Sequence, residues 1–183
     1  MKQEGYAIHD QYATYFLTFQ VVDWIDIFSR KIYRDIAIES FDYCRKEMDL
    51  KIFGYVIMTN HIHAIMKSPV GKLSSNIASF KKFTAVNILK KITEIHESRA
   101  SWMLKRFEIA TYKRNLKSNH QFWTTDNQPK ECFSRSFLLQ KLNYIHQNPV
   151  RAGFVDLPEH YLYSSARNYS NWLAVMEIDL LDI

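Results

Sequence analysis

The chain has 183 residues, of which 47% are hydrophobic and 15% aromatic, and its formal net charge at neutral pH is +5. This composition favours one ordered domain. The chain has only four Gly and four Pro, which leaves little room for long linkers or low-complexity segments. No apolar run is long enough to span a bilayer and no secretory signal is evident, so we expect a cytoplasmic protein with no membrane partner. Cys44 and Cys132 are isolated and are expected to be reduced thiols.

The first half of the chain alternates between strand and helix patterns. Aromatic and β-branched residues over positions 12–22 predict a first strand, and a helix capped by Ser29 is expected to follow to about residue 48. Residues 51–58 and 61–67 are two further predicted strands, separated by a two-residue polar break that suits a hairpin. Apolar residues at 3.6-residue spacing then predict a long helix over residues 72–95.

The pattern weakens over residues 100–130, where a strand is expected near residues 106–113 or 121–125. The order β-α-β-β-α, followed by a strand and a further helix, is typical of an α+β, ferredoxin-like split βαβ fold. We expect one domain over residues 1–183, with its core at about 12–169, built as an antiparallel sheet with helices packed on one face. The strand of residues 61–67 would be central, which leaves its other face available for a substrate.

Two histidines open that central strand. His61 and His63 are two residues apart, so their imidazoles project from the same face of the strand while Ile62 turns into the core. Two adjacent imidazoles on a rigid support form half of a site for a divalent metal.

A second set of polar residues lies on a helix near the C-terminus. This helix is expected to begin at Ser134 or Ser136 and to end at Asn148, before Pro149. A short helix is expected near residues 165–172. The apolar side of the longer helix, which should pack on the sheet, is formed by Leu138, Leu142 and Ile145, and a neighbouring polar stripe by Lys141, Tyr144 and Asn148.

Basic charge is concentrated in the middle of the chain. Residues 67–117 contain twelve Lys or Arg against three acids, a local balance of +9, whereas the remainder carries −4. A basic region of this kind favours a polyanionic partner. Together with two strand histidines and a tyrosine that can act as a nucleophile, it indicates metal-assisted attack on a phosphodiester.

The two motifs also resemble those of a known family. Residues 55–63, YVIMTNHIH, are similar to the His-hydrophobic-His signature of the HUH single-strand endonucleases, and residues 144–155, YIHQNPVRAGFV, resemble a segment of the REP-associated tyrosine transposases. These are small single-tyrosine relatives of insertion-sequence transposases. The resemblance extends over roughly residues 12–169. One departure is Thr59, where the family usually has proline before the Asn-His pair.

The resemblance implies a mechanism and a substrate. His61 and His63 would bind Mg²⁺ or Mn²⁺, with Asn148 as a further ligand, and Tyr144 on a catalytic helix would attack a DNA phosphate to leave a 5′-phosphotyrosine. The partner would be single-stranded or hairpin DNA, and the bacterial protein would associate with the nucleoid when bound. Either a monomer or a homodimer is compatible with the family. Candidate DNA-binding residues are Lys81, Lys82, Lys90, Lys91, Lys141 and Arg151.

Two alternatives remain open from the sequence. The chain could be a non-cleaving regulatory protein that binds DNA hairpins, or a phosphoesterase that uses a metal ion and water. A histidine-triad phosphoesterase is disfavoured because position 65 is Ile. His146 lies on the opposite side of its helix from Tyr144 and is expected to have a structural or DNA-side role, and Gly153 is expected to serve a turn.

Overall fold

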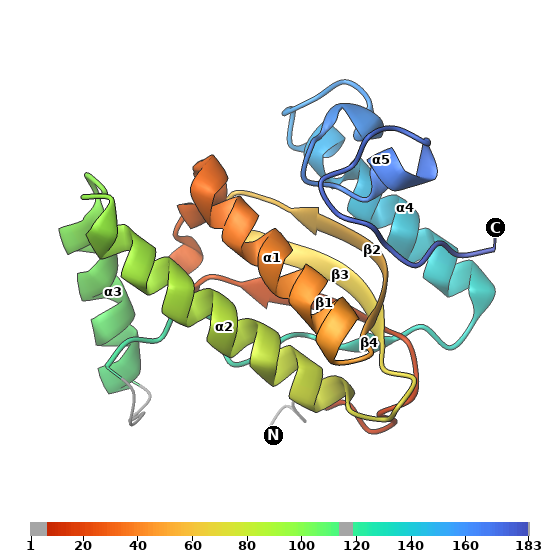
Figure 1. Ribbon diagram of the computed structural model, residues 1–183, viewed down its shortest axis with the longest axis horizontal. Helices are drawn as coiled ribbons and strands as arrows, with labels where there is room; N and C mark the ends of the chain where they lie inside the picture. Colours follow the sequence, from red (N-terminus) through yellow and green to blue (C-terminus); the bar gives the residue numbers. More distant parts are fainter. Residues whose placement is uncertain (1–6, 114–118, 183) are drawn as a thin grey trace, which may run out of the picture.

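The computed structural model describes residues 7–113 and 119–182. Figure 1 shows the chain as a sheet with two long helices on one side and a third long helix, α4, on the other. The elements are β1 (Tyr15–Gln20), η1 (Val22–Trp24), η2 (Ile27–Ser29), α1 (Lys31–Glu47), β2 (Lys51–Ile57), β3 (His61–Lys67), α2 (Leu73–Glu94), α3 (Ala100–Lys113), β4 (Lys130–Glu131), α4 (Arg135–Arg151), η3 (Pro158–His160) and α5 (Ala166–Tyr169).

The sheet has the strand order β2-β3-β1-β4 and is antiparallel throughout. Each helical crossover, β1-α1-β2 and β3-α2-β4, leaves one strand between the strands that it joins, which is the split βαβ arrangement. The α+β, ferredoxin-like prediction is therefore confirmed. The β2–β3 hairpin and the interior position of β3 are also as expected.

The main core lies between the sheet and helices α1 and α2. Alternate residues of β1, including Leu17 and Phe19, turn to this side and are fully buried. Phe80 of α2 stacks on Phe41 of α1 with ring centroids 4.2 Å apart and also contacts Phe19. The predicted helices on one face are thus α1 and α2, and their aromatic contacts fix them to the sheet.

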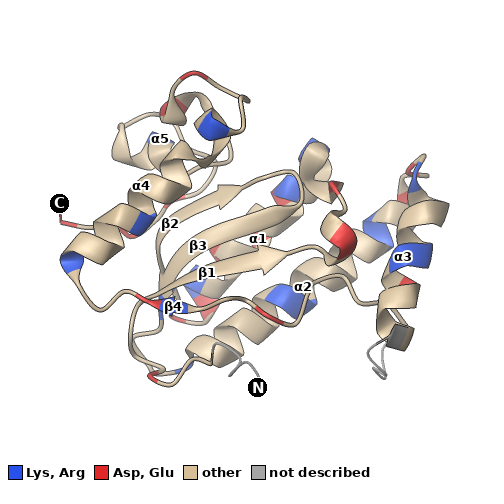
Figure 2. Cartoon of the chain, turned by 180° about the vertical axis from the view of Figure 1, so that it is seen from behind, with Lys and Arg blue, Asp and Glu red and all other residues tan. Residues whose placement is uncertain are grey.

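The opposite face of the sheet carries a smaller core under α4. Leu142 and Ile145 of α4 are buried against Val56 and Ile65 of the strands, which confirms the predicted apolar side of this helix. Close approach depends on Gly54, because a Cβ at this position would lie 2.6 Å from Leu142 Cδ1. Figure 2 views the molecule from this side, with α4 next to β2.

Edge strand β2 is covered by the C-terminal part of the chain. Ser165 donates its backbone N–H to Tyr55, and its hydroxyl accepts the Tyr55 N–H at 2.9 Å. Farther along the strand, Asp179 exchanges hydrogen bonds with the backbone of Ile52. These contacts satisfy backbone groups that an open edge would expose.

Two of the predicted elements differ from the structure in the first 113 residues. Ser29 does not cap α1, because it lies in the 3₁₀ turn η2 and Arg30 occupies the N-cap without a side-chain hydrogen bond. Residues 106–113 are helical rather than extended, since Phe107 and Met103 lie one turn apart on the buried side of α3. The fourth strand is instead β4, and residues 121–125 contribute only an isolated bridge, between Trp123 and Val21.

Helix α4 begins at the predicted cap but continues beyond its expected end. Ser134 is the N-cap, and its hydroxyl accepts the Phe137 N–H. Pro149 does not interrupt the helix, which continues past it to Arg151. The helix ends at Arg151, and Gly153 follows the C-cap residue Ala152 with a φ of 73° that glycine readily adopts. The Gly153 and Phe154 N–H groups bond back to carbonyls of the last turn. The predicted turn role of Gly153 is confirmed.

Among residues 7–113 and 119–182, no helix combines the length and the hydropathy that a bilayer span requires.

Candidate functional site

The predicted site residues lie around one pocket between the exposed sheet face and α4. The pocket has a volume of about 430 Å³. Strands β1 and β3 form its floor, α4 forms one wall, and the segment leading into β4 contributes to the rim. Its lining comprises Phe16, Thr18, Gln20, Trp24, His61, His63, Gln128, Lys130, Lys141, Tyr144 and Asn148.

The two histidines form the centre of the pocket floor. In the antiparallel register, Thr18 lies opposite His63 and Gln20 lies opposite His61, so all four side chains share one face. The His61 and His63 ring centroids are 4.7 Å apart. Adjacent imidazoles predicted from the i, i+2 spacing are therefore present in the structure.

Each histidine is oriented by a neighbouring oxygen. His61 Nδ1 lies 2.7 Å from Asn60 Oδ1, an atom that can only accept, so Nδ1 carries the proton and donates it. His63 Nδ1 lies 3.0 Å from the Thr18 hydroxyl oxygen. For His61 this leaves the Nε2 lone pair free to bind a metal. The Thr18 hydroxyl can donate or accept, so it orients the His63 ring and is compatible with the same tautomer.

Both imidazoles are held in the neutral form. Burial lowers the pKa of His61 below its usual value. For His63, burial is the main cause, and the repulsion that a protonated His61 would exert and the positive charge of Arg151 add to it, so that the pKa is lowered to about 3. A neutral imidazole is required for metal binding, so the electrostatics of the pocket suit that role.

Tyr144 projects from α4 beside the histidines. Its ring centroid is 5.4 Å from that of His63, with the two rings nearly perpendicular. Phe16 contacts both rings, stacking on His63 at 5.2 Å and meeting Tyr144 edge-on at 5.9 Å. Tyr144 remains 38% exposed, so it is packed against the site and still accessible to a ligand.

Positive charge surrounds the tyrosine. Lys141 Nζ lies 5.6 Å from the Tyr144 ring centroid, and the Arg151 guanidinium lies 4.5 Å from it on a side chain that also donates to the Tyr144 carbonyl at 3.0 Å. Burial, followed by the charge of Lys130, lowers the pKa of Lys141. Within the part of the chain that the structure describes, no acidic side chain lines this pocket. The pocket is therefore suited to an anionic ligand.

His146 lies away from the pocket and helps to dock α4. Its Nε2 lies 2.9 Å from the Ser165 hydroxyl, and its ring contacts Tyr169 at 5.3 Å. Burial lowers its pKa to about 4. The contacts are those of a structural residue, which is one of the two expected roles.

The donor set at the pocket fits a metal with mixed ligands. No cluster of three or more His, Cys, Asp or Glu side chains occurs among the described residues. A metal here would therefore be held by the two neutral imidazoles and by oxygen donors, such as the amide of Asn148 or Gln20 on the same lining. The residues present are compatible with a divalent cation that retains water or takes phosphate oxygen as further ligands.

Four of the predicted DNA-binding lysines lie elsewhere. Lys81, Lys82, Lys90 and Lys91 belong to α2, which packs on the other face of the sheet. Lys81 Nζ donates to the Thr124 carbonyl and to Asn127 Oδ1, and Lys90 and Lys91 both pair with Glu94. The structure thus places Lys141 in the pocket lining and Arg151 against the ring of Tyr144, and it places the α2 lysines on the other side of the sheet.

Sequence reasoning missed several lining residues: Phe16, Thr18, Gln20, Trp24, Gln128 and Lys130. The period-2 alternation of β1 contains a signal for the first three, since Phe16, Thr18 and Gln20 share one side of the strand and become polar along it. Lys130 lies opposite Phe16 in a strand of only two residues, which no periodicity could reveal.

Comparison with solved structures identifies a shared fold. The chain is similar to a REP-associated tyrosine transposase bound to a REP hairpin, with a TM-score of 0.59 and 16% identity over 99% of this chain and 95% of the other. A candidate transposase from Deinococcus radiodurans R1 gives a TM-score of 0.45 and 11% identity over 79% of this chain and 95% of the other. No family model and no curated protein matches the sequence. At 16% identity the first match establishes the shared fold, whereas function has to be argued from the site.

Proposed function

We propose that the protein is a metal-dependent single-strand DNA endonuclease and transposase of the REP-associated tyrosine transposase family. The observation that carries this proposal is the pocket in which Tyr144 lies beside the neutral pair His61 and His63. These residues come from segments about 80 positions apart in the sequence. The resemblance of both motifs to the family and the fold shared with a hairpin-bound transposase support the same conclusion.

The chemistry proposed for the pocket is displacement at phosphorus. The Tyr144 hydroxyl oxygen attacks a DNA phosphate, the bond from phosphorus to the 3′ oxygen breaks, and a 5′-phosphotyrosine and a free 3′-hydroxyl result. The phenol gives up its proton to water, and the departing oxygen takes one up. Mg²⁺ or Mn²⁺ held by His61, His63 and Asn148 would neutralise charge on the phosphate.

Basic residues in and beside the pocket would bind and orient the DNA. Lys130, Lys141 and Arg151 lie where they can attract the phosphate backbone, and Arg151 also restrains the tyrosine. A covalent phosphotyrosine conserves the energy of the broken phosphodiester, so a later 3′-hydroxyl can attack it and rejoin DNA. The arrangement therefore favours strand transfer over digestion. DNA hairpins with adjoining single strands are the proposed substrate.

Formation of the covalent intermediate tests this function. Purified protein incubated with Mn²⁺ and a single-stranded oligonucleotide that folds into a hairpin should give an adduct that survives denaturing electrophoresis. Tyr144→Phe should abolish the adduct, because only the attacking oxygen is removed. The exposed Tyr112 of α3 provides the matched control, and Tyr112→Phe should give wild-type adduct yield.

Two other results would contradict the proposal in different ways. Hairpin binding by the wild type without an adduct would favour a regulatory binding protein. Cleavage that persists in Tyr144→Phe would indicate a phosphoesterase that uses water as the nucleophile.

A further inference from the structure

Two phenylalanines, one exposed and one partly buried, stack on each other at the beginning of α4. The rings of Phe133 and Phe137 have centroids 5.4 Å apart and planes 15° apart. Phe133 is 79% exposed, one of the highest values among the large apolar residues described. Phe133 immediately precedes the N-cap Ser134, so the pair lies at the free end of the helix that carries Tyr144.

The stack is continuous with the pocket through Lys141. Lys141 Nζ lies 5.1 Å from the Phe137 ring centroid, 5.2 Å from that of Phe16 and 5.6 Å from that of Tyr144. One cation thus contacts the Phe133–Phe137 stack on one side and the floor and tyrosine of the pocket on the other. A row of aromatic faces interrupted by positive charge leads from the protein surface to the proposed nucleophile.

A purely structural role does not account for this exposure. An apolar contact across the first turn of a helix can fix the angle at which the chain enters it. Such a contact gains stability by removing apolar surface from water, yet Phe133 leaves most of its surface in water. Exposed aromatic faces beside a basic groove are instead the features by which proteins hold single-stranded nucleic acid, with each base stacked on a ring.

We propose that the Phe133–Phe137 stack is a shelf on which unpaired bases next to the scissile phosphate stack, with Lys141 bound to the intervening backbone. This inference rests on the proposed function, because it takes the occupant to be the strand whose phosphate reaches Tyr144. Stacking tolerates any base, so the shelf would hold and orient the strand without reading its sequence. Bases held there would limit the motion of the phosphate relative to the tyrosine.

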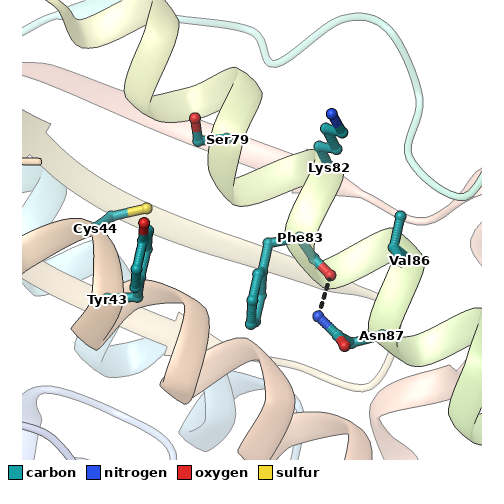
Figure 3. Close-up of a pocket in the computed structure, with 7 residues that line it drawn as sticks. All are labelled: Tyr43, Cys44, Ser79, Lys82, Phe83, Val86 and Asn87. Carbon is teal, nitrogen blue, oxygen red and sulfur yellow. Dashed lines mark hydrogen bonds between the residues drawn. The ribbon is translucent and has the colours of Figure 1, made fainter. Parts of the chain in front are cut away.

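The molecule contains a matched control for this surface. A groove between α1 and α2 has a volume of about 390 Å³. Tyr43, Phe83 and Val86 are among the side chains that line it (Figure 3). Tyr43 and Phe83 stack at 6.1 Å with planes 3° apart and are 51% and 41% exposed. This second aromatic pair lies across the sheet from Tyr144, so it resembles the shelf in chemistry but not in position.

The test measures base stacking directly in a background that cannot cleave. The probes are oligodeoxythymidylates that each carry 2-aminopurine at a different position, because this base fluoresces when free and is quenched when it stacks. With Tyr144→Phe protein, at least one probe position should be quenched on binding. Adding Phe133→Ala and Phe137→Ala should restore the fluorescence and weaken binding by about five-fold or more. Adding Phe83→Ala instead should change neither quantity.

The outcomes separate the shelf from the cleavage chemistry. Binding with quenching that is unaffected by Phe133→Ala and Phe137→Ala would overturn the shelf, even if wild-type protein forms the covalent adduct. Quenching that depends on these two rings would support the shelf, even if no adduct forms with wild-type protein. Circular dichroism of each variant checks that α4 remains folded. An equal loss of binding in Phe83→Ala would also contradict the assignment.

Discussion

At the scale of single residues, the properties of the proposed site depend on two neighbouring oxygens. Asn60 fixes the proton of His61 on Nδ1, and the Thr18 hydroxyl occupies the equivalent position next to His63. Neither side chain is a proposed metal ligand. Both nevertheless orient the imidazole rings, and hydrogen-bond partners of metal-binding histidines commonly change metal affinity by one to two orders of magnitude.

Removing one of these oxygens should weaken metal binding. Thr18→Val keeps the shape of the side chain and deletes the hydroxyl, so His63 loses its orienting partner and the affinity for Mn²⁺ should fall about ten-fold. Calorimetric titration of the folded protein with Mn²⁺ measures the change. Thr18→Ser retains the oxygen and should bind nearly as the wild type does. Equal affinity of the valine variant and the wild type would remove Thr18 from the site.

At the scale of elements, function depends on how closely α4 approaches the sheet. Gly54 lies under Leu142, and His146 bonds to Ser165, which itself is bonded to Tyr55 of β2. These contacts set the position of α4 along and above the strands. The position of Tyr144 relative to His63 therefore follows from the packing of α4 on β2. This strand lies two positions away in the sheet from β1, which carries Thr18.

A methyl group at Gly54 should displace this helix. Gly54→Ala places a carbon within contact distance of Leu142, so the free energy of unfolding should fall by about 1–3 kcal/mol and the covalent adduct should form more slowly. Leu142→Ala alone also destabilises, because it opens a cavity. The double variant should lose less stability than the two single variants together, since the new methyl group fills that space. Strictly additive losses in urea unfolding would contradict the steric explanation.

At the scale of the whole molecule, a buried carboxylate joins helices distant in the sequence. The Glu97 side chain is fully buried between α2 and α3, where Arg30 and Arg99 donate to it and Arg99 also pairs with Asp26. Burial by itself raises the pKa of this carboxyl, but hydrogen bonds from the backbone and side chain of Arg99 and from Arg30 outweigh it. The pKa of Glu97 therefore lies below its usual value.

This depressed pKa predicts a pH-dependent contribution to stability. A carboxylate that ionises more readily in the folded state stabilises the protein above its unfolded pKa of about 4.3, and the stabilisation is lost as the pH falls through the lower, native pKa. Glu97→Gln should therefore lower the free energy of unfolding at neutral pH by about 2 kcal/mol. This loss is smaller than the loss on breaking a fully buried ion pair, because both arginines are partly exposed.

Urea unfolding measured from neutral to acidic pH tests this prediction. The difference between the wild type and Glu97→Gln should be constant near neutrality and shrink once the pH falls below the unfolded pKa. Glu47, exposed on α1, provides the control, and Glu47→Gln should leave stability within about 0.5 kcal/mol of the wild type. A Glu97 difference that does not change with pH would show that the charge is not responsible.

The sequence by itself determined the local structure that carries the site. The apolar, β-prone run correctly predicted β3, and the two-residue spacing of the histidines predicted that both lie on one face. Helical periodicity predicted the apolar side of α4 and, with it, the polar stripe of Lys141, Tyr144 and Asn148. These patterns are short-range, because they reflect which side of a single element is removed from water. The split βαβ order followed from the succession of elements. The roles of the site residues stay predictions.

Only the tertiary structure decided what surrounds these residues. Thr18 and Gln20 join the histidines through the β1–β3 register, Lys130 enters through a two-residue strand, and the α2 lysines are placed across the sheet from Tyr144. The end of α4 beyond Pro149 and the helical form of residues 106–113 likewise depended on packing and turn geometry. Such features arise from contacts between segments far apart in the chain, where the pattern within any one segment carries no information.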